Sequence, residues 1–178
     1  MATEAPPEAG AQAAAQTFTG KEFRNALGSF ATGVTVITTR GAEHDYGMTA
    51  NAFTSVSMDP PLVLVCVISK SEGREILEEN GVFAVNVLSA DQEPLSNFFA
   101  SRDRPRGRDA FAKVAYRIEA SGAPVLDGAA AFLDCRLHET HEAGDHIIFI
   151  GEVLALGVDA EAKPLLFHGG GYAGLRDA

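Results

Sequence analysis

Apolar residues follow helix spacing near the N-terminus and strand spacing afterwards. Phe23, Leu27 and Phe30 stand at i, i+4 and i+7, which predicts a helix with one apolar side within residues 19–30. Beyond Gly33 the runs become β-branched or uniformly apolar, as is typical of strands. We expect strands at residues 34–39, 49–55, 62–68, 82–88, near 114–120, at 131–140 and at 146–157.

Two capping-box patterns predict short helices between these strands. Ser69-x-x-Glu72 can satisfy the free N–H groups of a first helical turn, and Gly81 is placed to end that helix. Ser89-x-x-Gln92 repeats the pattern ahead of a third helix. Six or seven strands and three short helices leave no room for the long helices of regular βαβ winding. We therefore expect a mainly β fold, an antiparallel barrel with short helices around it.

The apolar run at 62–68 contains no charge and does not alternate. A strand with one face in water normally alternates with period two, so both faces of this strand should be covered. One face can line the barrel interior. The other needs a helix or a second subunit, and this predicts a homodimer.

Length and composition indicate a single globular domain. The chain has 178 residues, of which 46% are hydrophobic and 21% charged. Residues 1–17 are rich in Ala, Pro and Glu and have no large apolar residue between Met1 and Thr17. They read as a disordered tail, so the domain is expected over residues 18–178.

Charge and cysteine content narrow the range of partners and locations. A net charge of -10 argues against binding to a nucleic-acid backbone or to an anionic membrane surface. Cys66 and Cys135 lie far apart and form neither a disulfide framework nor a metal-ligand spacing, which favours a cytoplasmic setting. Glu4 and Glu8 stand where an export signal would carry basic residues.

Small polar residues gather just before the most apolar strand. If residues 49–55 are extended, Thr49, Asn51, Phe53 and Ser55 share one face. Hydroxyls, an amide and an aromatic ring suit a flat heteroaromatic ligand, whose edge needs hydrogen bonds and whose ring needs apolar cover. Alternatively, Thr and Ser stand there only because they fit strand and turn positions. The residue types alone favour this structural interpretation.

Two segments are candidates for binding an anion. Ser69, Lys70 and Ser71 stand at an expected helix start, where free N–H groups attract phosphate, although plain capping explains Ser69 equally well. The loop at 101–109 is the densest basic segment and is either a phosphate contact or a solvated loop. Its basic residues are Arg102, Arg104, Arg106 and Arg108.

Three other patterns carry little weight. Gly169, Gly171 and Gly174 satisfy G-x-G-x-x-G, but the chain ends before a helix can follow, so a flexible glycine segment is the better interpretation. The histidines at 138, 141 and 146 match no familiar metal-ligand spacing, and we expect no metal. No nucleophile and base pair with a local signature is present.

Four segments in one order resemble a known family. They are "FATGVTVITT" (30–39), "GMTANAFTSVSMDPPLVLVCV" (47–67), "GVFAVNVLSADQEPLSNFFA" (81–100) and "GDHIIFIGEVLAL" (144–156). Together they resemble the short-chain flavin reductases, the reductase components of two-component flavin-dependent monooxygenases. The resemblance implies a split β-barrel and a homodimer. It also implies an NAD(P)H:flavin oxidoreductase that uses FMN or FAD with NADH or NADPH and supplies reduced flavin to a partner monooxygenase.

The resemblance also implies site residues. His146 corresponds to a histidine on the nicotinamide side, to which we assign an orienting hydrogen bond. Phe99 corresponds to an aromatic residue in a region that contacts flavin or nicotinamide. The segment near the ring edge and phosphate includes Cys66, Val67, Ser69 and Lys70. The segment lining the flavin includes Thr49, Ala50, Asn51, Ser55, Val56 and Ser57. The segment 167–172 departs from the family's aromatic and basic pattern, so nicotinamide contacts there are open.

Two other functions fit the same residues. One is a flavoprotein that holds FMN tightly as an electron carrier and hardly oxidises NAD(P)H. The other is a barrel that binds a different heteroaromatic ligand without redox chemistry. A reductase has to let nicotinamide and flavin rings stack within roughly 3–3.5 Å, with the flavin supplying the redox chemistry.

Overall fold

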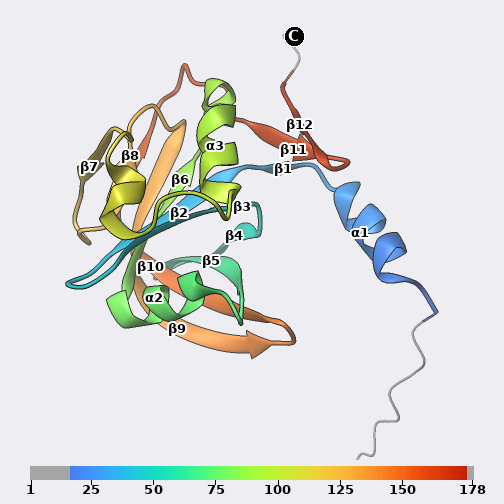
Figure 1. Cartoon of the computed structure of the whole chain (residues 1–178), viewed down its shortest axis with the longest axis horizontal. Coiled ribbons are helices and arrows are strands. Elements are labelled where there is room, and N and C mark those ends of the chain that lie inside the picture. Colours follow the sequence, from blue (N-terminus) through green and yellow to red (C-terminus); the bar gives the residue numbers. More distant parts are fainter. Residues whose placement is uncertain (1–16, 176–178) are drawn as a thin grey trace, which may run out of the picture.

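The computed structural model describes residues 17–175 and is built around a seven-stranded antiparallel sheet (Figure 1). All neighbouring strands in this sheet run antiparallel. The mainly β fold expected from the sequence is confirmed. From edge to edge the strands are β3 (Asp45–Ala50), β2 (Thr35–Arg40), β6 (Val82–Val87), β9 (Ala131–Ala143), β10 (His146–Val158), β5 (Pro61–Ile68) and β4 (Phe53–Met58).

The two edge strands, β3 and β4, follow each other directly in the chain. Only Asn51 and Ala52 connect them, so the two edges of the sheet must meet at this point. The Cys66 N–H donates to the Ala52 carbonyl at 3.0 Å and continues the pairing of the far edge up to the link. The sheet is thus curled into an incompletely closed barrel, a split barrel. The single strand expected over 49–55 is wrong, because the chain bends at this link.

The barrel interior is a close-packed apolar core. Burial along β5 alternates although its sequence does not: Val63, Val65 and Val67 are buried, whereas Leu62 and Leu64 on the other face are only half-buried. Within one chain, that outer face keeps part of its apolar surface exposed. The interior side chains come from five strands and α2, and include Ile37, Val63, Val65, Val67, Leu77, Phe83, Val85, Cys135, Ile147 and Phe149.

Helix α1 (Gly20–Gly28) lies apart from the barrel (Figure 1). Thr19 caps it as part of a capping box, and no residue of the helix is buried. Phe23 and Leu27 are 52% and 58% exposed, and Phe30 just beyond the helix is 76% exposed. The helix predicted from apolar spacing exists, but its apolar side is exposed: apart from a contact between the rings of Phe18 and Phe23, it packs on no core of the described chain.

The other two helices pack on the barrel. Helix α2 (Glu72–Asn80) starts after Ser71, whose side chain accepts from the Arg74 N–H, so the cap predicted at Ser69 is wrong by two residues. Gly81 ends this helix at a φ of 66°, as expected. Helix α3 (Glu93–Ala100) follows a short 3₁₀ turn (Ala90–Gln92) that opens with the predicted Ser89–Gln92 capping box.

Several short elements escaped the sequence pattern. A three-stranded sheet combines β1 (Thr32–Gly33), β11 (Leu166–His168) and β12 (Gly171–Ala173). Gly169 and Gly170 make its tight turn at φ values of 59° and 86°, so the interpretation of this segment as a flexible one is wrong.

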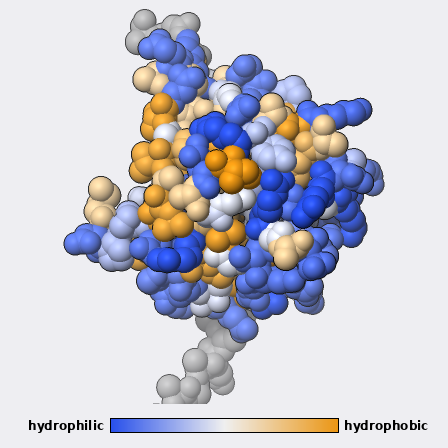
Figure 2. Space-filling model, turned by 90° about the vertical axis from the view of Figure 1, so that its left-hand side faces the viewer, coloured by the Kyte–Doolittle hydropathy of each residue, from blue (hydrophilic) through white to orange (hydrophobic). Residues whose placement is uncertain are grey.

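A second hairpin of short strands covers another side of the molecule. It pairs β7 (Tyr116–Ile118) with β8 (Pro124–Leu126) and follows a 3₁₀ segment, η2 (Gly107–Phe111). Figure 2 looks onto the side that carries β7 and β8, where apolar side chains are interspersed with strongly hydrophilic ones. Within residues 17–175, no helix is both long and apolar enough to cross a membrane.

Candidate functional site

A cavity of about 390 Å³ opens beside the link between β3 and β4; we call it the main cavity. Tyr46, Met48 and Ala50 alternate along β3 and are half-buried on one face. The end of β5, the start of β10 and the C-terminal end of α3 complete the walls. Besides those three residues, the lining comprises Thr49, Asn51, Ala52, Cys66, Val67, Ile68, Ser71, Phe99, Ala100, Arg102, Arg104 and His146.

Seven of the predicted site residues lie together around this cavity. These residues belong to three strands, one helix and the link between β3 and β4. Up to 97 positions separate them in the chain. They are Thr49, Ala50, Asn51, Cys66, Val67, Phe99 and His146.

Two of these seven are committed to the protein's own structure. The Thr49 hydroxyl donates to the Ser96 carbonyl at 2.6 Å, which ties β3 to α3. Phe99 is 1% exposed and its ring packs edge-on against Phe98 and tilted against Phe111. Both residues shape the wall of the cavity. Their polar and aromatic groups are largely taken up by internal contacts.

Asn51 is left free to bind. It is exposed, and its side-chain amide has no hydrogen-bond partner among residues 17–175. An amide offers two N–H donors and one acceptor, which can pair with the edge of a heteroaromatic ring. The site therefore retains the ring-edge chemistry that the sequence suggested at this position.

Five predicted residues lie outside the main cavity. Ser69 donates its hydroxyl to the Asp145 carbonyl at 3.0 Å and lines a separate cavity together with Arg74. Lys70 is exposed and stands beside neither cavity. The remaining three belong to β4, which the bend at Asn51 carries to the opposite edge of the sheet, and they are Ser55, Val56 and Ser57.

Arginines from the 101–109 loop border one end of the main cavity. Arg104 donates to the carbonyls of Gly47 and Ser101, both at 2.6 Å, and its guanidinium lies 5.1 Å from the centre of the Tyr46 ring. Arg104 thereby clamps the loop onto β3. Arg102 is exposed and has no ion pair or hydrogen bond within the described chain, so it offers a free positive charge.

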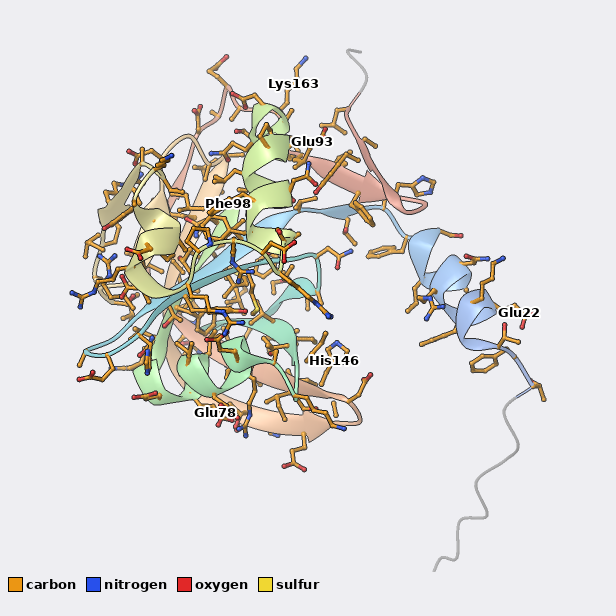
Figure 3. All side chains as sticks on the ribbon, in the orientation of Figure 1. Glu22, Glu78, Glu93, Phe98, His146 and Lys163 are labelled. Carbon is orange, nitrogen blue, oxygen red and sulfur yellow. The ribbon has the colours of Figure 1, made fainter. Side chains whose placement is uncertain are left out.

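His146 and Cys66 stand at the other end. His146 opens β10 next to β5 (Figure 3), and its Nδ1 lies 2.7 Å from the Asp145 carboxylate. This hydrogen bond lowers the pKa of the Asp145 carboxyl. Burial raises the pKa of the Cys66 thiol, which therefore stays uncharged at neutral pH and contributes an apolar surface.

Sequence reasoning missed some lining residues and left others undecided. Tyr46, Met48 and Ile68 were not singled out. An alternating reading of the segment 45–50 as one strand would have placed Tyr46 and Met48 on the face of Ala50. Ser71 and the arginine loop were candidates for phosphate binding, and the structure places Ser71, Arg102 and Arg104 around the main cavity.

The chemistry that this arrangement supports is binding and positioning. Half-buried apolar walls, a free amide and one free arginine suit a flat aromatic ring with an anionic tail. No hydroxyl or thiol in the main cavity stands next to a base that would activate it within the described residues. Residues 17–175 contain no group of three or more His, Cys, Asp or Glu side chains arranged for a metal ion.

Comparison with known proteins gives consistent matches over most of the chain. Residues 27–176 match the family model described as "Flavin reductase like domain". The chain is 45% identical to an NADH-dependent FAD reductase of Streptomyces globisporus, over 85% of this chain and 83% of that protein. It is 44% identical to the FMN reductase (NADH) SmoA of Agrobacterium fabrum, over 85% and 84% of the two chains.

Two further matches are components of larger enzyme systems. The reductase subunit HsaB of a flavin-dependent monooxygenase from Rhodococcus jostii is 38% identical, over 91% of this chain and 81% of that one. The solved structure of BorF, the flavin reductase component of a bacterial two-component tryptophan halogenase, superposes with a TM-score of 0.84 at 42% identity, covering 90% and 100% of the two chains. The chain belongs to the flavin reductase-like family.

Proposed function

We propose that the protein is an NADH-dependent flavin reductase that supplies reduced flavin to a partner monooxygenase. The observation that carries this proposal is the main cavity, which in a member of this family combines apolar walls with a free Asn51 amide and a free Arg102. Relatives named as NADH-dependent reductases and as reductase components of two-component systems support it. Flavin bound in this cavity supplies the hydride-accepting chemistry.

The residues of the chain bind and orient the two reactants. The Asn51 amide pairs with the polar edge of the flavin ring, while Cys66 and Val67 provide an apolar floor. Arg102 pairs with the phosphate at the other end. His146, which lines the same cavity, would orient the nicotinamide by donating a hydrogen bond to its carboxamide. The hydride passes directly between atoms of the two bound molecules, so the contribution of the protein is to hold the two rings close together and in the right orientation.

The rate of NADH oxidation as a function of added flavin tests this proposal. Purified protein is mixed with NADH and increasing FMN or FAD, and the absorbance of the nicotinamide is followed. A rate that rises with free flavin and saturates is the expected result. A protein that stays yellow but turns over no NADH would indicate the electron-carrier alternative. A protein that binds no flavin would indicate a different ligand.

The same proposal includes assembly as a homodimer. The apolar side chains of α1 are more than half exposed, and no residue of this helix is buried in its own chain. Strand β10 carries a second exposed apolar row at Leu154, Leu156 and Val158, with exposed fractions of 41%, 65% and 75%. Exposed apolar side chains gathered on one element in this way are typical of protein interfaces. A second copy of the chain accounts for both surfaces and for the half-covered outer face of β5.

A further inference from the structure

A second cavity, of about 200 Å³, adjoins the main cavity; we call it the arginine cavity. It lies between the start of β3, the first turn of α2 and the 101–109 loop. The two cavities share Tyr46, Arg102 and Arg104 as lining residues. A ligand that fills the main cavity with its ring can therefore continue past Arg102 without leaving the protein surface.

The charges of the arginine cavity favour a phosphate. Arg102 has no partner within the described chain, and Arg106 pairs only with Glu72, at 3.0 Å, with its side chain 77% exposed. Both guanidinium groups can turn toward an anion at little cost, because neither gives up a buried contact. In a chain of net charge -10, this concentration of positive charge is a local exception.

The same cavity also offers acceptors for hydroxyl or amino groups. Glu72 and Asp45 are both part of its lining. Asp45 is fully buried; its Oδ2 pairs with Arg40 at 2.7 Å, while its Oδ1 has no hydrogen-bond partner in residues 17–175. That oxygen is shielded from the cavity, so Glu72, whose side chain is 46% exposed, is the carboxylate that a ligand can reach. Arginine side chains bind phosphate, and the Glu72 carboxylate accepts hydrogen bonds from hydroxyl or amino groups, so this lining suits a nucleotide, which carries both kinds of group.

We propose that the arginine cavity binds the adenosine monophosphate half of FAD, so that this chain binds FAD more tightly than FMN. The inference rests on the proposed function, because it requires the flavin ring in the main cavity. Family membership leaves the choice open, since similar chains are named as an FAD reductase and as an FMN reductase. In this chain the two cavities adjoin at Arg102, and this continuity favours FAD over FMN.

The adenosine half of NADH has the same chemistry and is the competing occupant. Placing it in the arginine cavity would require the pyridine nucleotide to cross the phosphate end of the flavin before its nicotinamide reached the ring. Binding measured without NADH separates the two sources, because only FAD then carries an adenosine group.

The test compares Arg106→Ala, Arg102→Ala and Lys113→Ala. Arg106 lines the arginine cavity and not the main cavity, whereas Arg102 lines both. Lys113 is exposed and lines neither cavity, so Lys113→Ala is the control for the loss of one positive charge. Kd values for FAD and FMN are measured by quenching of flavin fluorescence in the absence of NADH. For Arg106→Ala we expect the Kd for FAD to rise about tenfold, as for the loss of one charge-assisted contact, with the Kd for FMN unchanged.

Each other variant has its own expected result. Arg102→Ala raises the Kd for both flavins, since both carry the phosphate nearest the ring, and Lys113→Ala changes neither. An unchanged Kd for FAD in Arg106→Ala, or an equal rise for FAD and FMN, overturns the inference. A raised KM for NADH with an unchanged Kd for FAD overturns it in favour of the pyridine nucleotide.

Failure of this inference is distinguishable from failure of the proposed function. If the wild-type protein oxidises NADH with FMN but Arg106→Ala binds FAD normally, only the arginine-cavity inference fails. If the wild-type protein oxidises no NADH with either flavin, the reductase proposal itself fails.

Discussion

At the scale of single residues, the main cavity contains side chains that fix its shape and side chains that are free to bind. Thr49 and Arg104 donate their hydrogen bonds to neighbouring backbone carbonyls. Asn51 and Arg102 make no such contacts within the described chain. The second pair can therefore be changed with little effect on stability, because exposed side chains without partners contribute little to folding.

Replacing Asn51 by Ala should weaken flavin binding selectively. We expect the Kd for flavin to rise about tenfold, since a polar ring edge loses its hydrogen-bond partner, with the melting temperature nearly unchanged. Fluorescence titration and thermal unfolding check the two parts. Thr54→Ala, which alters an exposed residue of β4, is the control. Equal flavin affinity in Asn51→Ala and wild type would remove Asn51 from the site.

Replacing His146 by Ala should raise the KM for NADH while leaving the Kd for flavin unchanged, because His146 is assigned to the nicotinamide alone. The control is His141→Ala, which removes a histidine on the same hairpin that pairs with Glu139 at 3.3 Å. Steady-state kinetics at saturating flavin provide the measurement. Unchanged kinetics in His146→Ala would remove the assignment.

His146→Ala should also change the pKa of Asp145, independently of NADH binding. The hydrogen bond from His146 lowers the pKa of the Asp145 carboxyl in the folded protein. A carboxyl of this kind favours folding above its ordinary pKa, and that contribution is lost as the pH falls through the lowered value. NMR titration should therefore show the Asp145 pKa returning upward to its ordinary range in His146→Ala. A pKa that stays low would show that another group is responsible.

At the scale of elements, the site depends on close contact between β3 and α3. Gly47 lies directly under Phe99, so that a Cβ at this position would stand 2.5 Å from Phe99 Cε1. Gly33 on β1 is the natural comparison, since a Cβ there meets nothing within 4 Å. The two glycines therefore separate a steric requirement of the cavity wall from the general cost of altering a strand glycine.

Gly47→Ala should destabilise the protein by about 1–3 kcal/mol, because the added methyl group would overlap the buried Phe99 ring and force it to shift. Gly33→Ala should change the free energy of unfolding by much less. Urea unfolding measures both, and flavin affinity should fall only in Gly47→Ala. Equal stability of the two variants would show that the β3–α3 contact is more pliable than its geometry indicates.

The sequence predicted the long strands of the fold and missed most of the short ones. Long apolar or β-branched runs identified β2, β5, β6, β9 and β10 within a few residues, because runs of this length and composition are typical of buried strands. The strands β1, β8, β11 and β12 have only two or three residues, too few for a period to show. No Gly or Pro next to Asn51 signals the bend in the sequence. The bend arises from the way the two edges of the sheet meet when the barrel closes, which a local pattern cannot show.

The site was predictable only where the resemblance and the chain path agreed. Asn51, Cys66 and His146 come together because the end of β3, the end of β5 and the start of β10 meet at the main cavity. Ser55 to Ser57 follow the same segment in sequence but lie beyond the bend. The sequence showed that the 101–109 loop is basic but not where it lies in the fold. The structure places the loop beside β3, where Arg104 donates a hydrogen bond to the Gly47 carbonyl.

At the scale of the whole molecule, the exposed apolar surfaces of α1 and β10 lead to the prediction of a homodimer. Light scattering should give about twice the 18.7 kDa of one chain. Phe23→Asp with Leu27→Asp should shift the protein to a monomer while the barrel stays folded, because α1 contributes no buried residue. Lys21→Ala on the same helix is the control. A single species of 18.7 kDa in the wild type would contradict the dimer.

The central claim is that flavin bound in the main cavity accepts hydride from NADH. Anaerobic mixing of a small amount of protein with NADH and excess FMN or FAD tests it most directly, by following the flavin absorbance. The account predicts that the free flavin pool is bleached, with one NADH consumed per flavin reduced, and that Asn51→Ala slows the bleaching. A flavin pool that remains oxidised while the protein binds flavin would contradict the account.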